Sequence, residues 1–118
     1  MPKASKQQTR TTFRESVFRR DGYICQVCGR QWRPEDADPS LGRMNAHHIT
    51  DRNEMPNGGY VPENGITVCD GPTSCHMRVE QWHITKGASV EKGLHPDDLY
   101  NKIGSSHEEA VEASGRLL

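Results

Sequence analysis

Residues 25–28 read CQVC, and residues 69–75 read CDGPTSC. These two stretches contain all four cysteines of the 118-residue chain. A CxxC pair followed about forty residues later by a second pair fits a tetrahedral zinc site with four thiolate ligands. Five residues separate the second pair, where two are more common, so this loop is enlarged. The alternative is four free structural cysteines.

The composition explains why a metal would be needed. Hydrophobic residues make up 32% of the chain, with only two Phe, two Trp and three Tyr, so the apolar core is thin. Small domains with thin cores are usually held together by disulfides or a metal. No apolar run could span a membrane, and MPKASKQQTR lacks the apolar segment of a secretory signal. We therefore expect a cytoplasmic protein whose reduced cysteines bind a structural zinc ion. The expected ligands are Cys25, Cys28, Cys69 and Cys75.

Charge is unevenly distributed along the chain. Residues 1–33 contain eight basic and two acidic residues, a balance of +6. Residues 34–83 contain three basic and eight acidic residues, a balance of −5, and residues 84–118 have a balance of −2. A basic segment beside an acidic, histidine-rich centre suits a protein that binds a polyanion and acts on it with a metal. The alternative is a solubilising basic tail.

Hydrophobic spacing and turn residues predict a small α+β fold. Phe13 and Val17 are four residues apart, Thr12 and Glu15 form a capping-box pattern, and Gly22 supplies a stop. These signals place a helix over residues 11–22, and the other expected elements are strands over 43–50 and 65–69, a helix over 74–85, and one or two short helices over 95–114. The expected organisation is a disordered basic arm (1–10), a central domain (11–87) and a helical C-terminal extension (88–118).

Two adjacent histidines, His47 and His48, lie in the stretch NAHHITDRNE (45–54). On a strand, neighbouring side chains point to opposite faces, so the two rings would have different surroundings. The alternative is a pair of polar surface residues, which is the usual interpretation of an isolated HH pair.

The ordered set of motifs resembles the HNH endonucleases, members of the His-Me finger or ββα-metal group. Their pattern is a CxxC knuckle, a strand ending in HH or DH, a loop, an Asn that opens the second strand, and a His just after the last Cys. Here the order is RRDGYICQVCG, AHHI, PENGITVC and CH, over residues 19 to about 83. The resemblance implies a ββα-metal core stapled by the Zn(Cys)4 knuckle, and metal-dependent hydrolysis of phosphodiester bonds.

The resemblance also implies a role for each matching residue. His47 is expected to bind the catalytic metal and His48 to be the general base, which suits a neutral imidazole near pH 7. Asn64 matches the middle Asn, which braces the loop and orients the base histidine. It is also a turn residue before Gly65, and both interpretations can hold. His76 matches the last His of the family, a metal ligand.

The family often has another histidine four residues after the last one, and Glu80 occupies that position here. On a helix, His76 and Glu80 lie one turn apart on one face, whereas His83 lies about 10 Å from His76 along the axis. We therefore expect Glu80 to be the auxiliary ligand, and His83 to be a phosphate contact or a surface residue. A carboxylate ligand favours Mg²⁺ or Mn²⁺, with Zn²⁺ or Ni²⁺ as alternatives. His95 and His107 lie outside the pattern and are expected at the surface.

These inferences predict a small metal-dependent DNA endonuclease. Arg14, Arg19 and Arg20 are expected to contact DNA phosphates, although a solvated helix face is the default for such residues. The context resembles small phage or mobile-element nucleases, which suggests an infected bacterial host and partners among phage packaging or recombination proteins. The rival is a non-catalytic zinc-knuckle module that binds nucleic acid or protein, and it leaves the histidines and Asn64 unexplained.

Overall fold

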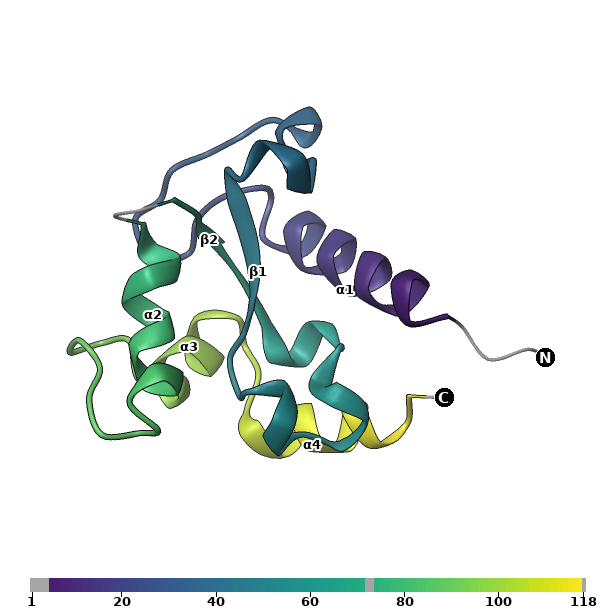
Figure 1. Cartoon of the computed structure of the whole chain (residues 1–118), viewed down its shortest axis with the longest axis vertical. Coiled ribbons are helices and arrows are strands. Elements are labelled where there is room, and N and C mark those ends of the chain that lie inside the picture. Colours follow the sequence, from purple (N-terminus) through teal and green to yellow (C-terminus); the bar gives the residue numbers. More distant parts are fainter. Residues whose placement is uncertain (1–4, 72–73, 118) are drawn as a thin grey trace.

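A computed structural model describes residues 5–71 and 74–117 of the chain. Within these residues it contains four α-helices and one two-stranded sheet (Figure 1). The regular elements are α1 (Lys6–Arg20), β1 (Met44–His48), β2 (Gly65–Cys69), α2 (Cys75–Ile84), α3 (Pro96–Lys102) and α4 (His107–Gly115). The 3₁₀ turns of the described connections are η1 (Pro34–Ala37), η2 (Pro39–Leu41), η3 (Arg52–Glu54), η4 (Pro56–Gly59) and η5 (Pro62–Asn64). The prediction of a small α+β fold is confirmed.

The two strands form an antiparallel hairpin at the centre of the molecule. Met44 lies opposite Cys69, and His48 lies opposite Gly65. Both strands fall within the ranges predicted from the sequence. Figure 1 shows α1 and α2 on opposite sides of this hairpin. Because side chains alternate along a strand, consecutive residues of β1 therefore face different helices.

The first helix begins earlier than the sequence predicted. Ser5 is its N-cap and forms a reciprocal capping box with Gln8, so two backbone donors at the helix start are satisfied. Residues 6–10 are therefore helical, and the prediction of a disordered arm over residues 1–10 is wrong for this part. Its first four residues lie outside the described residues. The pattern of Thr12 and Glu15 that suggested a start lies inside α1, where backbone donors already have helical partners.

A glycine allows α1 to pack directly against β2. A Cβ atom on Gly65 would lie 2.5 Å from Val17 and 2.8 Å from Phe13, closer than real side chains approach. Val17 and Phe18 are 0% and 1% exposed, so this helix face forms part of the core. Any larger residue at position 65 would push α1 away from the hairpin.

The C-terminal helices α3 and α4 share the core of the rest of the chain. Leu99, Tyr100 and Ala110 belong to the same buried cluster as Ile66 of β2 and Val79 of α2. The region predicted as one or two short helices thus contains two. Their packing brings side chains of the C-terminal segment close to the hairpin.

The longest described helix, α1, has 15 residues and carries many charged side chains. Among the described residues, no helix combines the length and the apolar character that crossing a membrane requires.

Candidate functional site

The four cysteines lie together where the 25–28 knuckle meets the connection from β2 to α2. Their sulfur atoms all lie within 4.8 Å of one another, and the Cys28 and Cys69 sulfurs are 3.9 Å apart. Two thiolates bound tetrahedrally to one zinc ion, each at about 2.3 Å, lie roughly 3.8 Å apart. All four cysteines are free of disulfides. The cluster could therefore hold a metal such as zinc.

Electrostatics around the sulfurs favour a cation. Burial raises the pKa of Cys25, but backbone N–H groups of Cys28 and Val27 outweigh this effect and lower it to about 7. The pKa of Cys75 is raised, first by burial and then by hydrogen bonding to Cys69 and the charge on Cys25. Four neighbouring thiolates repel one another, so a bound cation would be needed to ionise them all.

A second group of donors lies between β1 and α2. His47, His76 and Glu80 each offer one ligand atom, and these atoms lie within 4.8 Å of one another. The Nδ1 atom of His47 is 3.2 Å from Oε2 of Glu80, and the Nε2 atom of His76 is 3.3 Å from the same oxygen. His76 and Glu80 meet because they are four residues apart on one helix. His47 reaches them because its face of β1 points toward α2.

The donor set could hold a metal ion. Two ligand atoms at about 2.1 Å from a shared ion lie roughly 3.2 Å apart when they subtend an angle near 100°. Burial lowers the pKa of His47, which favours the neutral imidazole that a metal requires. Hydrogen bonds from His47 and His76 hold the pKa of Glu80 far below its usual range. His83 does not belong to this group.

Asp70 supports the same group from behind, and the sequence motifs did not reveal it. Its Oδ1 atom lies 3.2 Å from Nδ1 of His76, so the other ring nitrogen of His76 points toward Glu80. Hydrogen bonds to Glu80 and then to Asp70 raise the pKa of His76. Carboxylates behind a metal-binding histidine commonly fix its orientation. Only the position next to Cys69 could have suggested that Asp70 lies nearby.

His48 faces the opposite helix and is enclosed by aromatic rings. Its ring stacks on Phe13 of α1 with centroids 4.6 Å apart, and meets the Tyr60 ring edge-on at 4.7 Å. Burial and the neighbouring His47 lower the pKa of His48 to about 4. Its Nε2 atom is buried and has no hydrogen-bond partner among the described residues. The ring is therefore neutral at pH 7, and Nδ1 is the nitrogen that can meet the cavity.

Asn64 is 0% exposed and braces the segment that follows His48. Its Oδ1 atom accepts a hydrogen bond from the backbone N–H of Thr50 at 3.0 Å, and its Nδ2 atom donates to the Thr50 carbonyl at 3.0 Å. Its backbone carbonyl accepts from the N–H of Ile49 at 2.9 Å. A second bond from Nδ2 reaches the carbonyl of Gly59 at 3.2 Å. One side chain therefore fixes the backbone on both sides of the loop between the strands.

Tyr100 of α3 completes this bracket. Its hydroxyl donates to Oδ1 of Asn64 at 2.7 Å, and lies 2.6 Å from the hydroxyl of Thr50. Tyr100 is 2% exposed. The C-terminal extension was expected to carry little chemistry, and the hydroxyl contact was not foreseen because 36 residues separate Tyr100 from Asn64.

Both histidines of the pair line one cavity of about 580 Å³. Its charged lining consists of three arginines and three carboxylates: Arg10, Arg14, Arg52, Asp51, Asp70 and Glu80. Arg14 was among the arginines expected to contact DNA, and Arg19 is exposed on the same helix without lining this cavity. Arg10 and Arg52 were not singled out in the sequence, because neither lies in a recognisable motif.

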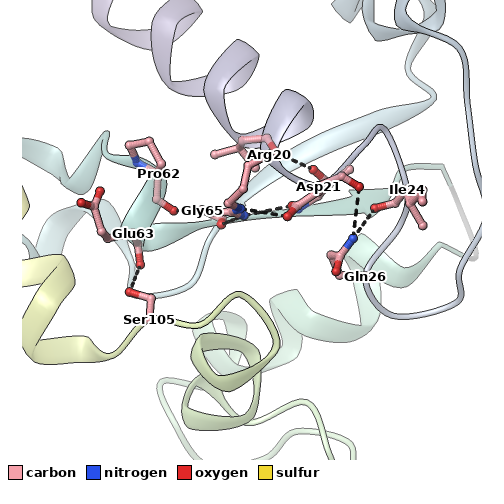
Figure 2. A network of polar contacts seen from close by, with 10 residues as sticks. Arg20, Asp21, Ile24, Gln26, Pro62, Glu63, Gly65 and Ser105 are labelled. Carbon is pink, nitrogen blue, oxygen red and sulfur yellow. Dashed lines mark hydrogen bonds and ion pairs between the residues drawn. The ribbon is translucent and has the colours of Figure 1, made fainter.

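Arg20 has a structural position that differs from the expected one. Its guanidinium donates to both carboxylate oxygens of Asp21, at 2.9 and 3.0 Å, and to the backbone carbonyls of Pro62 and Gly65, each at 2.6 Å (Figure 2). Asp21 in turn accepts from the backbone N–H of Thr67 at 2.9 Å. The expectation that Arg20 contacts DNA stays a prediction, and in the structure its donors tie the end of α1 to β2.

His83 is half-buried rather than a surface residue. Its Nε2 atom lies 2.9 Å from the backbone carbonyl of His48. A carbonyl only accepts, so this nitrogen carries the proton. The ring also stacks on His47 with centroids 5.2 Å apart. His83 thus holds the strand end that carries both members of the histidine pair.

The remaining histidines lie outside this cluster. His107 is exposed at the start of α4, as expected. His95 is half-buried, and its Nδ1 atom accepts a hydrogen bond from the backbone N–H of Asp97 at 3.0 Å, which caps α3. Its ring lies 4.5 Å from that of Trp82. The prediction of a surface residue is therefore only partly right for His95.

Comparisons with protein-family models, with curated proteins and with solved structures found no match to this chain.

Proposed function

We propose that this protein is a metal-dependent DNA endonuclease of the HNH type, with a ββα-metal core. The observation that carries the proposal is the convergence of His47, His76 and Glu80 on one wall of a cavity that His48 also lines. The wall belongs to β1 and α2, and β2 completes the hairpin. The order of these elements is the one that the family resemblance implies.

We assign His47, His76 and Glu80 as the ligands of a catalytic divalent ion. Such an ion would neutralise charge that develops on the phosphate and stabilise the leaving oxygen. With one carboxylate among the three ligands, Mg²⁺ or Mn²⁺ suits the site, and Zn²⁺ or Ni²⁺ suits its two imidazoles. Asp70 orients His76 through the ring nitrogen that faces away from Glu80.

We assign His48 as the general base. Nδ1 is its acting atom, because Nε2 is buried. A water molecule loses a proton to Nδ1 while its oxygen forms a bond to phosphorus and the opposite phosphorus–oxygen bond breaks. The leaving oxygen then takes a proton from solvent. Asn64 and His83 hold the backbone beside the base, the first at Ile49 and Thr50 and the second at His48 itself.

The cysteine cluster has a separate task in this proposal. A structural zinc ion would link the knuckle that follows α1 to the start of α2, and so hold the two ends of the catalytic unit together. Cys69 and Cys75 are direct neighbours of Asp70 and His76 in the chain. A zinc ion at the cysteines would therefore also fix the position of the second donor group.

The charge of the cavity explains how DNA could enter it. Three arginines face three carboxylates, so the lining without an ion has no excess charge to attract a polyanion. A divalent ion would give the cavity a positive balance. Arg14 lines the cavity, and Arg19 extends the basic surface along α1, so these two remain as proposed phosphate contacts.

The second candidate function is a zinc-knuckle module that binds nucleic acid without cutting it. The cysteine cluster and the basic residues of α1 favour it as much as the first. It gives no role to the buried contact between His47 and Glu80, or to the polar bracket around Asn64.

Cleavage of a supercoiled plasmid separates the two functions. The wild type should convert it to nicked or linear DNA with Mg²⁺ or Mn²⁺ and should stop when EDTA is added. The variant His48→Ala should lose the activity, and His107→Ala is a matched control because His107 is exposed outside the cavity. A wild type that binds the plasmid but leaves it intact with Mg²⁺, Mn²⁺, Zn²⁺ and Ni²⁺ would favour the binding module.

A further inference from the structure

Two arginines converge on one tyrosine at the edge of the cavity. The guanidinium of Arg10, on α1, lies over the Tyr60 ring at 5.8 Å from its centroid. The guanidinium of Arg52, in η3, donates to the Tyr60 hydroxyl at 3.4 Å. All three residues line the cavity. Arg10 and Arg52 are 42 positions apart in the sequence, so the fold brings their two positive charges to the same tyrosine.

The tyrosine also touches the proposed base. Its ring meets His48 edge-on at 4.7 Å and Phe13 at 5.7 Å. The ring is therefore fixed between α1 and the end of β1. Whereas the neighbouring His47 ring contacts Glu80 of α2, both guanidinium groups contact the same tyrosine that the His48 ring meets. An anion held there would be next to the reacting phosphate without being the reacting phosphate.

In the part of the chain that the structure describes, the arginines of the cavity lack the carboxylate partners that five other arginines have. Five arginines pair with carboxylates in the described part of the chain: Arg20, Arg33, Arg43, Arg78 and Arg116. Within that same part, no carboxylate lies within ion-pair distance of Arg10, Arg14 or Arg52. The donors of Arg10 and Arg52 are thus steadied by an aromatic ring and a hydroxyl while their charge is left unneutralised.

We propose that Arg10, Arg52 and Tyr60 form a binding subsite for one non-scissile phosphate of the bound strand. Two planar guanidinium forks match the oxygens of a phosphodiester, and Tyr60 keeps them converged. This inference rests on the proposed function, because the proposed ligand is a phosphate of DNA. The subsite sets the register of the strand, since it places a neighbouring phosphate at a fixed position beside His48.

The salt dependence of DNA binding tests the proposal without any cleavage. The full chain with its zinc is titrated onto a short DNA duplex in buffer without added divalent ions, over a range of salt concentrations. Each neutralised phosphate contributes about 0.9 to the slope of log K against log salt. The double variant Arg10→Ala/Arg52→Ala should lower the slope by about 0.9, because both arginines serve one phosphate. Each single variant should lower it by less.

Arg30→Ala is the matched control, because Arg30 lies over the Trp32 ring at 5.3 Å and does not line the cavity. Its slope should equal that of the wild type. A fall of about 1.8 in the double variant would mean two separate phosphates, and an unchanged slope would mean that the arginines serve only to pack Tyr60. Either result would overturn the subsite. Circular dichroism of each variant establishes that a changed slope comes from a folded protein.

A cleavage experiment then locates the phosphate. In duplexes with a single neutral methylphosphonate near the cut, one position should slow the wild type about tenfold, the loss expected for a charge-assisted contact. The double variant should show no further loss at that position. If the methylphosphonate slowed the double variant as much as it slows the wild type, this would contradict the subsite. A wild type that does not cut at all, but shows the expected salt slopes, would refute the endonuclease while the phosphate subsite stands.

Discussion

The hydroxyl of Tyr100 donates a hydrogen bond to Oδ1 of Asn64 at 2.7 Å. This contact joins the third helix to the bracket that fixes the end of β1. Because Oδ1 also accepts from the backbone of Thr50, the loss of the hydroxyl would leave Asn64 free to shift by a small amount. That shift would reach the proposed base through the backbone.

We expect Tyr100→Phe to lower the cleavage rate more than it lowers DNA affinity. The ring would stay in the core, and a lost buried hydrogen bond costs about 1–2 kcal/mol of unfolding free energy. Single-turnover cleavage measures the rate, titration with DNA measures the affinity, and urea unfolding measures the loss of stability. Ser105→Ala is the control, since it removes the bond to the Glu63 carbonyl at 2.9 Å and should cost stability alone. Equal rate losses in both variants would mean that Tyr100 acts only through stability.

Substitution of the two adjacent histidines should cause different defects in cleavage. His48→Ala should lose about 10²–10⁴-fold in rate without recovery at high Mn²⁺, because a missing base cannot be replaced by metal. His47→Ala and His76→Ala should weaken the metal and recover part of their activity as Mn²⁺ rises. Calorimetric titration with Mn²⁺ beside cleavage rates distinguishes the two kinds of defect. Rescue of His48→Ala but not of His47→Ala would reverse the assignment.

The cysteine cluster should retain metal through purification. We expect about one tightly bound zinc ion per chain, and Cys25→Ser or Cys69→Ser should impair folding, because a four-thiolate site contributes directly to the folding free energy. Native mass spectrometry counts the ion, and circular dichroism reports the fold. A well-folded wild type without zinc would rule the site out.

Arg20 should matter for stability rather than for DNA. Arg20→Ala removes the bonds that join α1 to β2 and leaves the buried carboxylate of Asp21 without its partner, at a cost of about 1.5–3 kcal/mol. Arg19→Ala, at an exposed position of the same helix, should change the unfolding free energy by less than about 0.5 kcal/mol. Urea unfolding compares the two. If both variants unfold like the wild type, the network of Figure 2 contributes nothing to stability.

Asp36 should make the fold sensitive to acid. The backbone N–H of Arg33, and then the charge of Arg43, lower the pKa of Asp36 below its ordinary value of 3.8. A carboxylate with a lowered pKa stabilises the folded state above that ordinary value, and this contribution is lost as the pH falls through the folded-state pKa. The stability difference between wild type and Asp36→Asn should therefore be largest near pH 6 and shrink toward pH 3. Urea unfolding of both proteins at several pH values measures this difference. A difference that stays constant with pH would contradict the prediction.

Local patterns in the sequence were sufficient for the elements around the site. The ranges of β1, β2 and α2 follow from hydrophobic spacing and from the turn residues that bound each stretch. The start of α1 was misplaced because two capping patterns compete, and the one at Ser5 and Gln8 lengthens the helix by about two turns.

The contacts that the sequence did not reveal join residues far apart in the chain. Tyr100 reaches Asn64 across 36 positions, and Arg20 reaches Gly65 across 45. Arg10 and Arg52, 42 positions apart in the sequence, both contact Tyr60. Periodicity and motif spacing describe neighbours within one element, so they give no information on contacts that arise only when the core closes.

The two donor clusters share the ends of one short segment. Cys69 is followed directly by Asp70, and Cys75 directly by His76, so a single peptide bond separates a sulfur-bearing residue from a member of the imidazole and carboxylate group at each end. A displacement of one donor cluster is therefore transmitted through the backbone to the other. For protein engineering, residues 69–76 must therefore be transferred to another scaffold as one segment, with both donor clusters. A change in the length of this segment would displace donor groups of both clusters.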